Sequence, residues 1–305
     1  MHVRLLGTAA GGGFPQWNCG CLNCEGVRRG TIRAQPRTQS CAAVSADRQR
    51  WFLLNASPDV RIQIESFVPL LPHGTVRGTA IQGILLTNAD LDHTLGLLVL
   101  RENGRLSVHA TSSVQRALDE GFHLSEVLAR YGGVDWHQPP ARLAPLVCAD
   151  GTLSGLRYAA FPVPGKLPRY REGRASSSAE DAVGYLLVDE STGGRLVCVP
   201  GLAALDREVL IRLQEADALL LDGTFWSEVE MQNVGTGTAS AREMGHLPVG
   251  SEEGSLSAMA SLPAARKIYV HINNTNPMLR EDSPERRAVE KAGVEVGWDG
   301  LEFTL

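Results

Sequence analysis

The sequence predicts an α/β protein in which two sheets pack together and helices cover their outer faces. Short apolar runs outnumber helical patterns along the chain, and several of these runs end abruptly in small or polar residues. Continuous apolar runs such as 84–86 and 218–221 imply strands that are buried on both faces. The chain has 305 residues, of which 43% are hydrophobic and 21% charged, so it can bury a full core.

The predicted strands all lead into residue types that are common in turns and functional sites. Side chains just past strand ends are where α/β proteins usually place their chemistry. The runs that we predict as strands are 3–6, 51–54, 84–86, 218–221 and 268–270.

Helices are predicted where apolar residues recur at helical spacing, and loops where Gly, Ser and charged residues gather. Strands, a first polar motif and helices fill residues 1–145, and a similar order of elements fills residues 146–305. We therefore expect a single domain, 1–305, built from two similar halves. The helical segments are 112–120, 124–131, 206–216 and 283–292, and the loops are 165–181 and 234–254.

Charge and hydropathy exclude two classes of protein. The chain has 34 acidic and 29 basic side chains and a formal charge of −5, whereas nucleic-acid binding normally requires a surplus or clustering of Lys and Arg. The amino-terminal residues lack the apolar stretch of a signal peptide, and no apolar run approaches the roughly 18 residues of a membrane span. We expect a cytoplasmic protein with no nucleic-acid partner and no membrane insertion.

The motif Thr-Asn-Ala-Asp-Leu-Asp-His, residues 87–93, follows a predicted strand. Asp90, Asp92 and His93 offer carboxylate oxygens and an imidazole nitrogen, which are ligands of Zn, Mn and Fe(II). The alternative is that Asp90 or Asp92 caps a helix beginning near His93. Asp222 and His271 also end apolar runs, and a set of such groups at strand ends favours a shared metal site.

The cysteines predict a second site. Six cysteines are too sparse for a disulfide scaffold, but Cys19, Cys21 and Cys24 fall within six positions on a Gly-rich loop. Three thiolates at this spacing can bind one tetrahedral Zn. The alternative is three free thiols, which oxidise readily when exposed. Cys148 and Cys198 lie in apolar runs and are predicted to be inert core residues.

Taken together, the motifs resemble a known family. The 87–93 motif is similar to the Thr-His-x-His-x-Asp-His motif of the metallo-β-lactamase superfamily, with Asp222 and His271 in the expected order. The Gly-rich turn 7–13, the cysteine cluster, Met-Gly-His-Leu-Pro-Val at 244–249 and His-Ile-Asn-Asn-Thr-Asn-Pro at 271–277 resemble one branch, the pyrroloquinoline quinone (PQQ) biosynthesis protein B family. The resemblance implies a four-layer αββα sandwich, two mixed sheets with outer helices.

The departures from the hydrolase motif indicate a change of chemistry. Asn88 and Asp90 replace its two leading histidines, and no histidine follows 160–165, where the hydrolases have their middle metal ligand. Two-metal hydrolysis is therefore disfavoured. Asp92, His93, Asp222 and His271 remain as a set with open positions, similar to the donors of non-haem Fe(II) oxygenases. Asp90 is a weaker candidate ligand or catalytic group.

The resemblance implies a role in PQQ biosynthesis, as an iron-dependent hydroxylase that uses O2 to oxygenate the tyrosine ring of a Glu-Tyr precursor. Zn, Mn or Cu are alternatives to Fe(II). A carrier that holds PQQ or its precursor, and helps its transport to the periplasm, is a second interpretation, and a residual metallohydrolase is a third. The expected partners are a small-molecule or dipeptide precursor and other PQQ biosynthesis proteins, and a homodimer is compatible with the resemblance.

The same resemblance assigns further residues. Related phosphodiesterases hold a structural zinc with a similar cysteine cluster and a histidine, and Asn274 stands at the histidine position, so the fourth ligand is the Asn274 amide oxygen, a water or Cys41. His246 aligns with a histidine that the phosphodiesterases place beside the scissile bond, and it is a candidate acid or base, the alternative being a solvated loop histidine. Arg169, Arg171 and Arg174 are either a solvated face or partners for substrate carboxylates.

Overall fold

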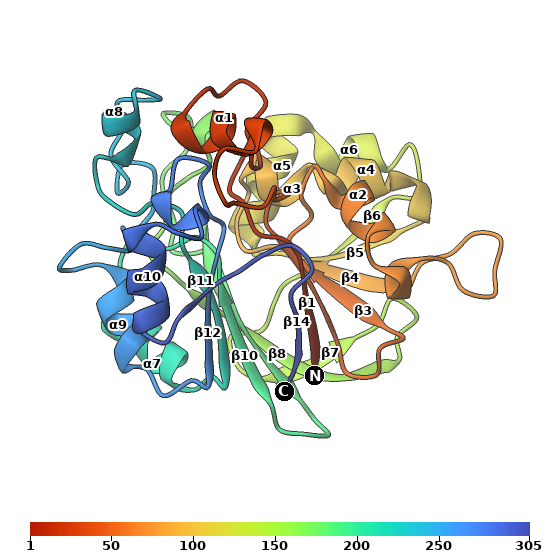
Figure 1. Cartoon of the computed structure of the whole chain (residues 1–305). Coiled ribbons are helices and arrows are strands. Elements are labelled where there is room, and N and C mark those ends of the chain that lie inside the picture. The colour runs from red at the N-terminus through yellow and green to blue at the C-terminus, as the bar shows by residue number, and fades with distance from the viewer.

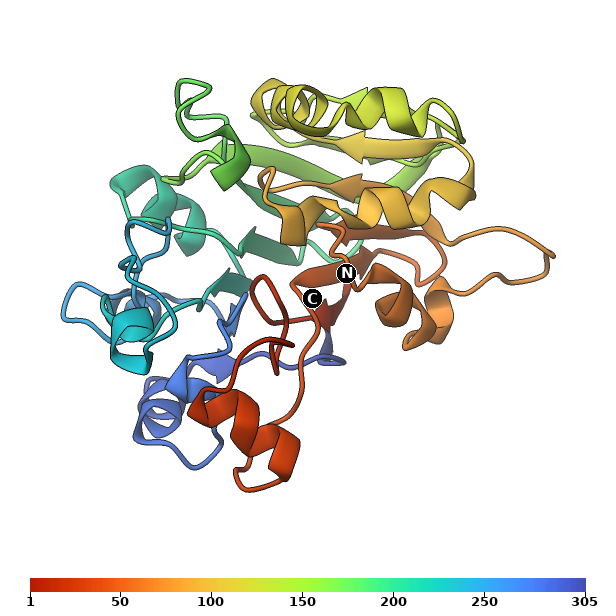
Figure 2. The ribbon, with the colours of Figure 1, turned by 90° about the horizontal axis from the view of Figure 1, so that it is seen from above.

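The protein, described here by a computed structural model, is a four-layer sandwich (Figure 1). The structure describes residues 1–305 except the side chain of Asn103. Each sheet has seven strands and is mixed, so the predicted architecture of two mixed sheets with outer helices is confirmed. Seen from above, the yellow helices α5 (Ser112–Phe122) and α6 (Leu124–Leu128) and the blue α10 (Pro284–Lys291) lie on opposite sides of the molecule (Figure 2).

The first sheet contains strands from the first 137 residues and the last strand of the chain. Its three pairings from β14 to β3 are antiparallel and its three pairings from β3 to β6 are parallel. The order is β14 (Glu302–Thr304), β1 (His2–Gly7), β2 (Cys41–Ser45), β3 (Trp51–Leu54), β4 (Ile81–Leu85), β5 (Leu106–His109) and β6 (Val134–His137).

The second sheet repeats this arrangement with strands from residues 144–296. Its pairings from β13 to β10 are parallel and those from β10 to β7 are antiparallel. The order is β13 (Glu295–Val296), β12 (Arg266–Val270), β11 (Ala218–Asp222), β10 (Arg195–Val199), β9 (Val183–Asp189), β8 (Leu153–Pro162) and β7 (Ala144–Val147).

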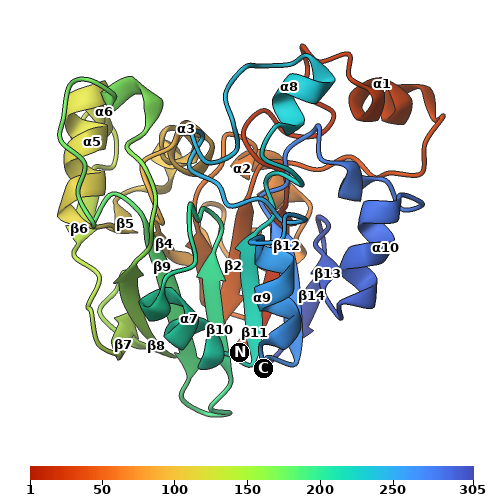
Figure 3. The same cartoon turned by 90° about the vertical axis from the view of Figure 1, so that its left-hand side faces the viewer.

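Helices cover the outer faces and one end of the sandwich. Figure 3 shows α1, α3 and α8 at the end of the sheets opposite to the two termini. Besides α5, α6 and α10, the helices are α1 (Leu22–Arg29), α2 (Val60–Glu65), α3 (Leu91–Thr94), α4 (Gly96–Val99), α7 (Arg207–Gln214), α8 (Glu230–Val234) and α9 (Ser255–Ser261). Short 3-10 turns are η1 (Val68–Leu70), η2 (Leu100–Asn103), η3 (Arg169–Arg171) and η4 (Pro277–Leu279). Among the helices that the structure describes, none has the length and hydropathy needed to span a bilayer.

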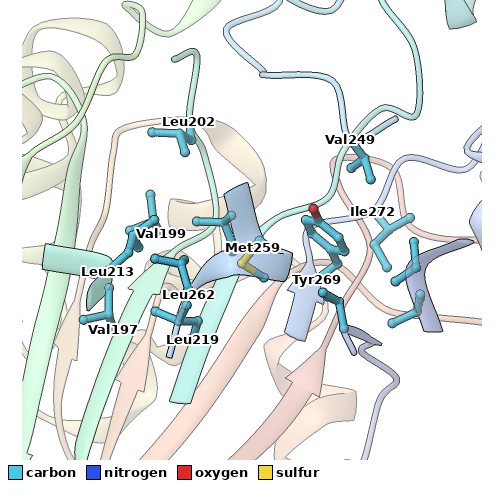
Figure 4. Close-up of a cluster of buried hydrophobic side chains, with 14 of the residues drawn as sticks. Val197, Val199, Leu202, Leu213, Leu219, Val249, Met259, Leu262, Tyr269 and Ile272 are labelled. Carbon is cyan, nitrogen blue, oxygen red and sulfur yellow. The ribbon is translucent and has the colours of Figure 1, made fainter. Parts of the chain in front are cut away.

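Alternation along the strands divides the core into three clusters. In β11, Leu219 and Leu221 point to the helices while Ala218 and Leu220 point to the other sheet, because successive side chains of a strand face opposite ways. Figure 4 shows Leu219 in the cluster that packs against α7 and α9, together with Leu213, Met259 and Leu262. Burial on both faces fixes the two sheets against each other, so the loops at their ends have a rigid support.

A buried histidine links the two sheets, from the next-to-last strand of one to the next-to-last strand of the other. His109 Nδ1 lies 2.8 Å from the hydroxyl of Tyr158 in the opposite sheet, and burial lowers the pKa of His109 to about 3. The unfolded chain therefore takes up a proton near pH 6.5, whereas the folded chain does so only near pH 3. Stability that comes from the neutral imidazole is complete above pH 6.5 and is lost as the pH falls towards 3.

We expect His109→Gln to make the free energy of unfolding depend less on pH under acidic conditions. Glutamine keeps an acceptor for Tyr158 but does not titrate. Between pH 6 and 4, the free energy of unfolding of the variant should therefore fall less steeply with decreasing pH, by up to about 1.4 kcal/mol per pH unit. Urea unfolding at a series of pH values measures this slope. His73→Gln, at an exposed position, is the matched control, and equal slopes for both variants would contradict the assignment.

Candidate metal centre

The candidate centre lies where the ends of β4, β11 and β12 meet. β11 and β12 run parallel with Asp222 opposite Val270, so His271 follows one position beyond Asp222 at the same edge. The 87–93 motif follows β4 in the other sheet. The carboxyl ends of parallel strands are the usual place for ligand sites in α/β folds.

Asp92, His93 and His271 come together there. One possible ligand atom from each lies within 4.8 Å of the others. His271 Nε2 is 3.0 Å and His93 Nε2 is 3.9 Å from Asp92 Oδ2. His93 Nε2 is buried and has no hydrogen-bond partner among the residues that the structure describes. A buried polar atom normally has a partner, so this donor set fits a metal ion that would accept the His93 lone pair.

The charge states suit a cation. Burial raises the pKa of Asp92, but the electrostatic interaction with His93 and the hydrogen bond from His271 outweigh it and hold this pKa well below its usual range. Burial lowers the pKa of His93 to about 4. Metal ligands must be deprotonated, and near neutral pH Asp92 is ionised while His93 is neutral. Burial lowers the pKa of His271, but Asp92 and the other carboxylates outweigh it and raise this pKa, so a metal ion would have to displace a proton from this ring.

Neighbouring side chains turn both imidazoles towards the centre. Asn88 Oδ1 lies 2.7 Å from His93 Nδ1, and because an amide oxygen only accepts, the proton of His93 sits on Nδ1 and leaves the Nε2 lone pair free. Thr224 Oγ1 lies 2.7 Å from His271 Nδ1 and donates its own proton to Asp222, so it accepts from Nδ1. His271 Nε2 donates to Asp92 at 3.0 Å, and a metal ion would take the place of this proton. Such partners fix the tautomer and orientation of metal-binding histidines.

We expect Thr224→Val to weaken metal binding at this centre by about 10- to 100-fold while leaving the fold intact. Valine has the shape of threonine but cannot accept the Nδ1 proton of His271. Competition with a chelator of known affinity measures the change. Thr152→Val, whose hydroxyl bonds only within an exposed turn, is the control, and an unchanged affinity in Thr224→Val would remove the positioning role.

His246 forms a second group with Asp222 and His271. His246 Nδ1 is 2.7 Å from Asp222 Oδ2, and its ring stacks on His271 with centroids 5.3 Å apart. Asp222 also accepts from the backbone N–H of Leu202 and from Thr224. Burial raises the pKa of Asp222, but His246 and the other donors outweigh it and lower this pKa. The predicted four-residue set is thus divided between two groups that share His271.

The cysteine cluster lies at the same end of the molecule. The sulfurs of Cys19, Cys21 and Cys24 are within 4.8 Å of one another. The side-chain amide of Asn274 faces all three, with Nδ2 3.2 Å from Cys19 Sγ and 3.3 Å from Cys24 Sγ. Rotation of this amide group by a half-turn would make its oxygen, in place of Nδ2, face the three sulfurs. The Cys41 thiol instead donates to the backbone oxygen of Asn55 and does not join the cluster.

The cluster joins the first and last segments of the chain. Asn23 of α1 donates to the backbone oxygens of Asn274 and Asn276 at 3.1 and 2.9 Å. Figure 2 shows the red α1 beside the blue segment that follows β12. Three thiols and one amide at a single point are a donor set that fits a tetrahedral ion.

Comparisons with known proteins decide the family. The beta-lactamase superfamily domain matches residues 50–272. The chain is 44% identical to coenzyme PQQ synthesis protein B of Pseudomonas syringae pv. tomato, and equally so to that of Pseudomonas entomophila, with 100% of each chain covered. The chain belongs to the coenzyme PQQ synthesis protein B family. The family resemblance of the sequence is thereby confirmed.

Solved structures agree with membership of the coenzyme PQQ synthesis protein B family. The crystal structure of Zn(2+)-bound PqqB from Methylobacterium extorquens matches with a TM-score of 0.91 and 39% identity over 100% of both chains. A diphosphatase from the PhnP family matches with a TM-score of 0.67 and 18% identity over 100% of this chain and 97% of its own, and shows the fold alone. The metallo-β-lactamase-type sandwich is confirmed.

Asp90 belongs to neither of the two groups in this member of the coenzyme PQQ synthesis protein B family. It occupies the position before α3, but its side chain makes no capping hydrogen bond and instead accepts from Asn88 Nδ2 at 2.9 Å. Burial and the charge of Asp92 raise the pKa of Asp90 to about 6. Its predicted role as ligand or catalytic group therefore stays a prediction.

The three arginines lie on η3 and just after it. Arg171 pairs with Glu120 of α5, and Arg169 and Arg174 are exposed. Between them, the Tyr170 hydroxyl donates to the backbone oxygen of Ala89 at 2.9 Å and holds this turn against the 87–93 motif. Binding of a substrate by these arginines stays a prediction.

Sequence reasoning missed what the Gly-rich turn 7–13 does in this family member. Gly11 lies against Asp92, since a Cβ at Gly11 would come within 3.5 Å of the carboxylate. Ala10 also donates to the backbone oxygen of Ile272 at 2.9 Å. The signal was present, because a run of small residues just after a strand lets the backbone approach a site closely.

Proposed function

We propose that the protein acts in the synthesis of coenzyme PQQ as an iron-dependent hydroxylase that adds oxygen to the tyrosine ring of a Glu-Tyr precursor. The relatives are named for PQQ synthesis, and one is a Zn(2+)-bound protein. The observation that carries the hydroxylase assignment is the Asp92, His93 and His271 group, in which a buried His93 Nε2 lacks a partner among the described residues. Two histidines and one carboxylate with open positions are the donor set of non-haem Fe(II) oxygenases.

Fe(II) held by these three residues would supply the activation of O2. The residues of the chain orient the ligands of this ion and exchange protons with a bound substrate. Asn88 and Thr224 hold the two imidazoles in the ligating tautomer. His246 is fixed by Asp222 through Nδ1, so its Nε2 is the atom that can donate a proton to, or accept one from, a bound substrate. A structural Zn at the cysteine cluster would hold α1 against the loop after His271.

Two residues of the 87–93 motif disfavour hydrolysis at this site. Asn88 and Asp90 stand where hydrolases of the superfamily have imidazoles, and in this structure Asn88 bonds to both Asp90 and His93. A second cation would therefore lack the ligands that it needs to hold a leaving oxygen.

The test is anaerobic loading with Fe(II) followed by exposure to O2 and a peptide containing Glu and Tyr. We expect O2 consumption together with a peptide product heavier by one oxygen atom, and neither with Zn-loaded protein. Stoichiometric binding of PQQ or the peptide without turnover would instead support a carrier that assists transport to the periplasm. Cleavage of the peptide or of a phosphodiester would support a metallohydrolase.

A further inference from the structure

The segment after β8 brings a lysine to the rim of the candidate centre. Two backbone hydrogen bonds fix this segment, from Val163 to Ala182 at 3.1 Å and from Ala203 to Pro164 at 2.8 Å. Ala182 in turn forms a bridge with Asn88 of the metal-binding motif. The chain two and three residues before Lys166 is therefore held next to that motif.

The stem of Lys166 runs over Gly245, the residue before His246. A Cβ on Gly245 would lie 3.0 Å from Lys166 Cγ and 3.2 Å from its Cδ. Gly245 also has a φ of +84°, a left-handed conformation that glycine adopts without strain. The absence of a side chain at this position leaves room for the stem of Lys166 beside His246, and the positive charge of Lys166 acts on Asp90.

Among the side chains that the structure describes, the ammonium group has only a weak partner. Lys166 Nζ lies 3.6 Å from Glu172 Oε1, and the two side chains are 35% and 54% exposed. An exposed pair of this kind contributes little, so a better-placed anion can displace Glu172. Lysine carries a compact charge on a flexible stem, which suits it to binding a carboxylate.

We propose that Lys166 is an anion-binding residue of the substrate site, where its ammonium group pairs with a carboxylate of the substrate beside Asp90 and His246. The proposal rests on the proposed function for the nature of the substrate, an amino-acid-derived molecule with carboxylates. In this arrangement Lys166 binds the substrate without participating in oxygen chemistry.

Calorimetric titration of the Zn-loaded protein tests this without turnover. The probes are the dipeptide Glu-Tyr and Gln-Tyr-amide, which has the same shape but no carboxylates. We expect the natural chain to bind Glu-Tyr about tenfold or more tightly than the amide, since a charge-assisted hydrogen bond discriminates by this amount. Lys166→Met should remove the preference and Lys166→Arg should restore some of it. Lys291→Met, on the exposed side of α10, should leave it unchanged.

Either of two results would overturn the proposal: a Glu-Tyr preference that survives in Lys166→Met, or a natural chain that shows no preference. The outcome is separable from that of the hydroxylase test. Hydroxylation without a preference that depends on Lys166 would refute this inference alone. A preference that depends on Lys166 in a protein that never consumes O2 would refute the hydroxylase and support the anion site.

Discussion

Replacing His271 with asparagine is expected to empty the centre formed with Asp92 and His93. His271 is the residue common to both groups of possible ligands, and its Nε2 lies 3.0 Å from Asp92 Oδ2. We expect metal affinity to fall by more than the 10- to 100-fold typical of losing an outer hydrogen-bond partner, because one of three ligands is lost. Oxygen-dependent activity should disappear with it. Metal content after dialysis and competition with a chelator measure the effect.

Asparagine is chosen because of the backbone at this position. His271 has a φ of 55°, a left-handed conformation that asparagine tolerates better than alanine. His123 provides a matched control, since it also has a left-handed φ, of 51°, and its side chain is 75% exposed at the end of α5. His123→Asn should keep the full metal content. If His271→Asn retained its metal as well, the assigned ligand set would be wrong.

The position of the site could be predicted because it follows from strand order. His271 directly follows β12, whereas Asp92 and His93 lie in α3, which begins after the turn that follows β4 in the other sheet. The carboxyl ends of parallel strands are where α/β folds usually place their sites. The hydrophobic runs identified these strands, since their side chains are buried on both faces. The meeting of residues 92 and 271, which are 179 positions apart, is thus a consequence of topology.

The division of the ligand set could not be predicted, because it depends on local geometry. Asp222 accepts from Leu202, Thr224 and His246, and these contacts depend on where the loops after β10 and β11 and the 234–254 loop settle. The same holds for the basic residues near the site. Composition showed positive charge at 169–174, but only the fold shows that Arg171 pairs with Glu120 and that the stem of Lys166, outside this run, lies beside Gly245.

Replacing Cys21 with serine is expected to release the metal of the cysteine cluster and to destabilise the fold. The cluster joins the loop at 19–24 to Asn274, and Cys24 and Asn274 are 250 positions apart in the chain. A bond that closes so long a loop removes much entropy from the unfolded chain, and a structural metal contributes its binding energy to folding. By analogy with the loss of a native cross-link, we expect a cost of about 2–5 kcal/mol and a fall in Tm of about 5–10 °C.

The cysteine variant separates the two metal sites. Cys21→Ser should lose the metal of the cluster but keep the one at Asp92, His93 and His271, because the variant leaves those side chains untouched. Cys148→Ser is the control, since Cys148 is also a free cysteine but lies outside the cluster. Because Cys148 is buried, Cys148→Ser can itself lower Tm. It should not change the metal content or the effect of a chelator on Tm. A chelator that lowered the Tm of Cys21→Ser as much as that of the natural chain would show that the cluster does not hold a structural ion.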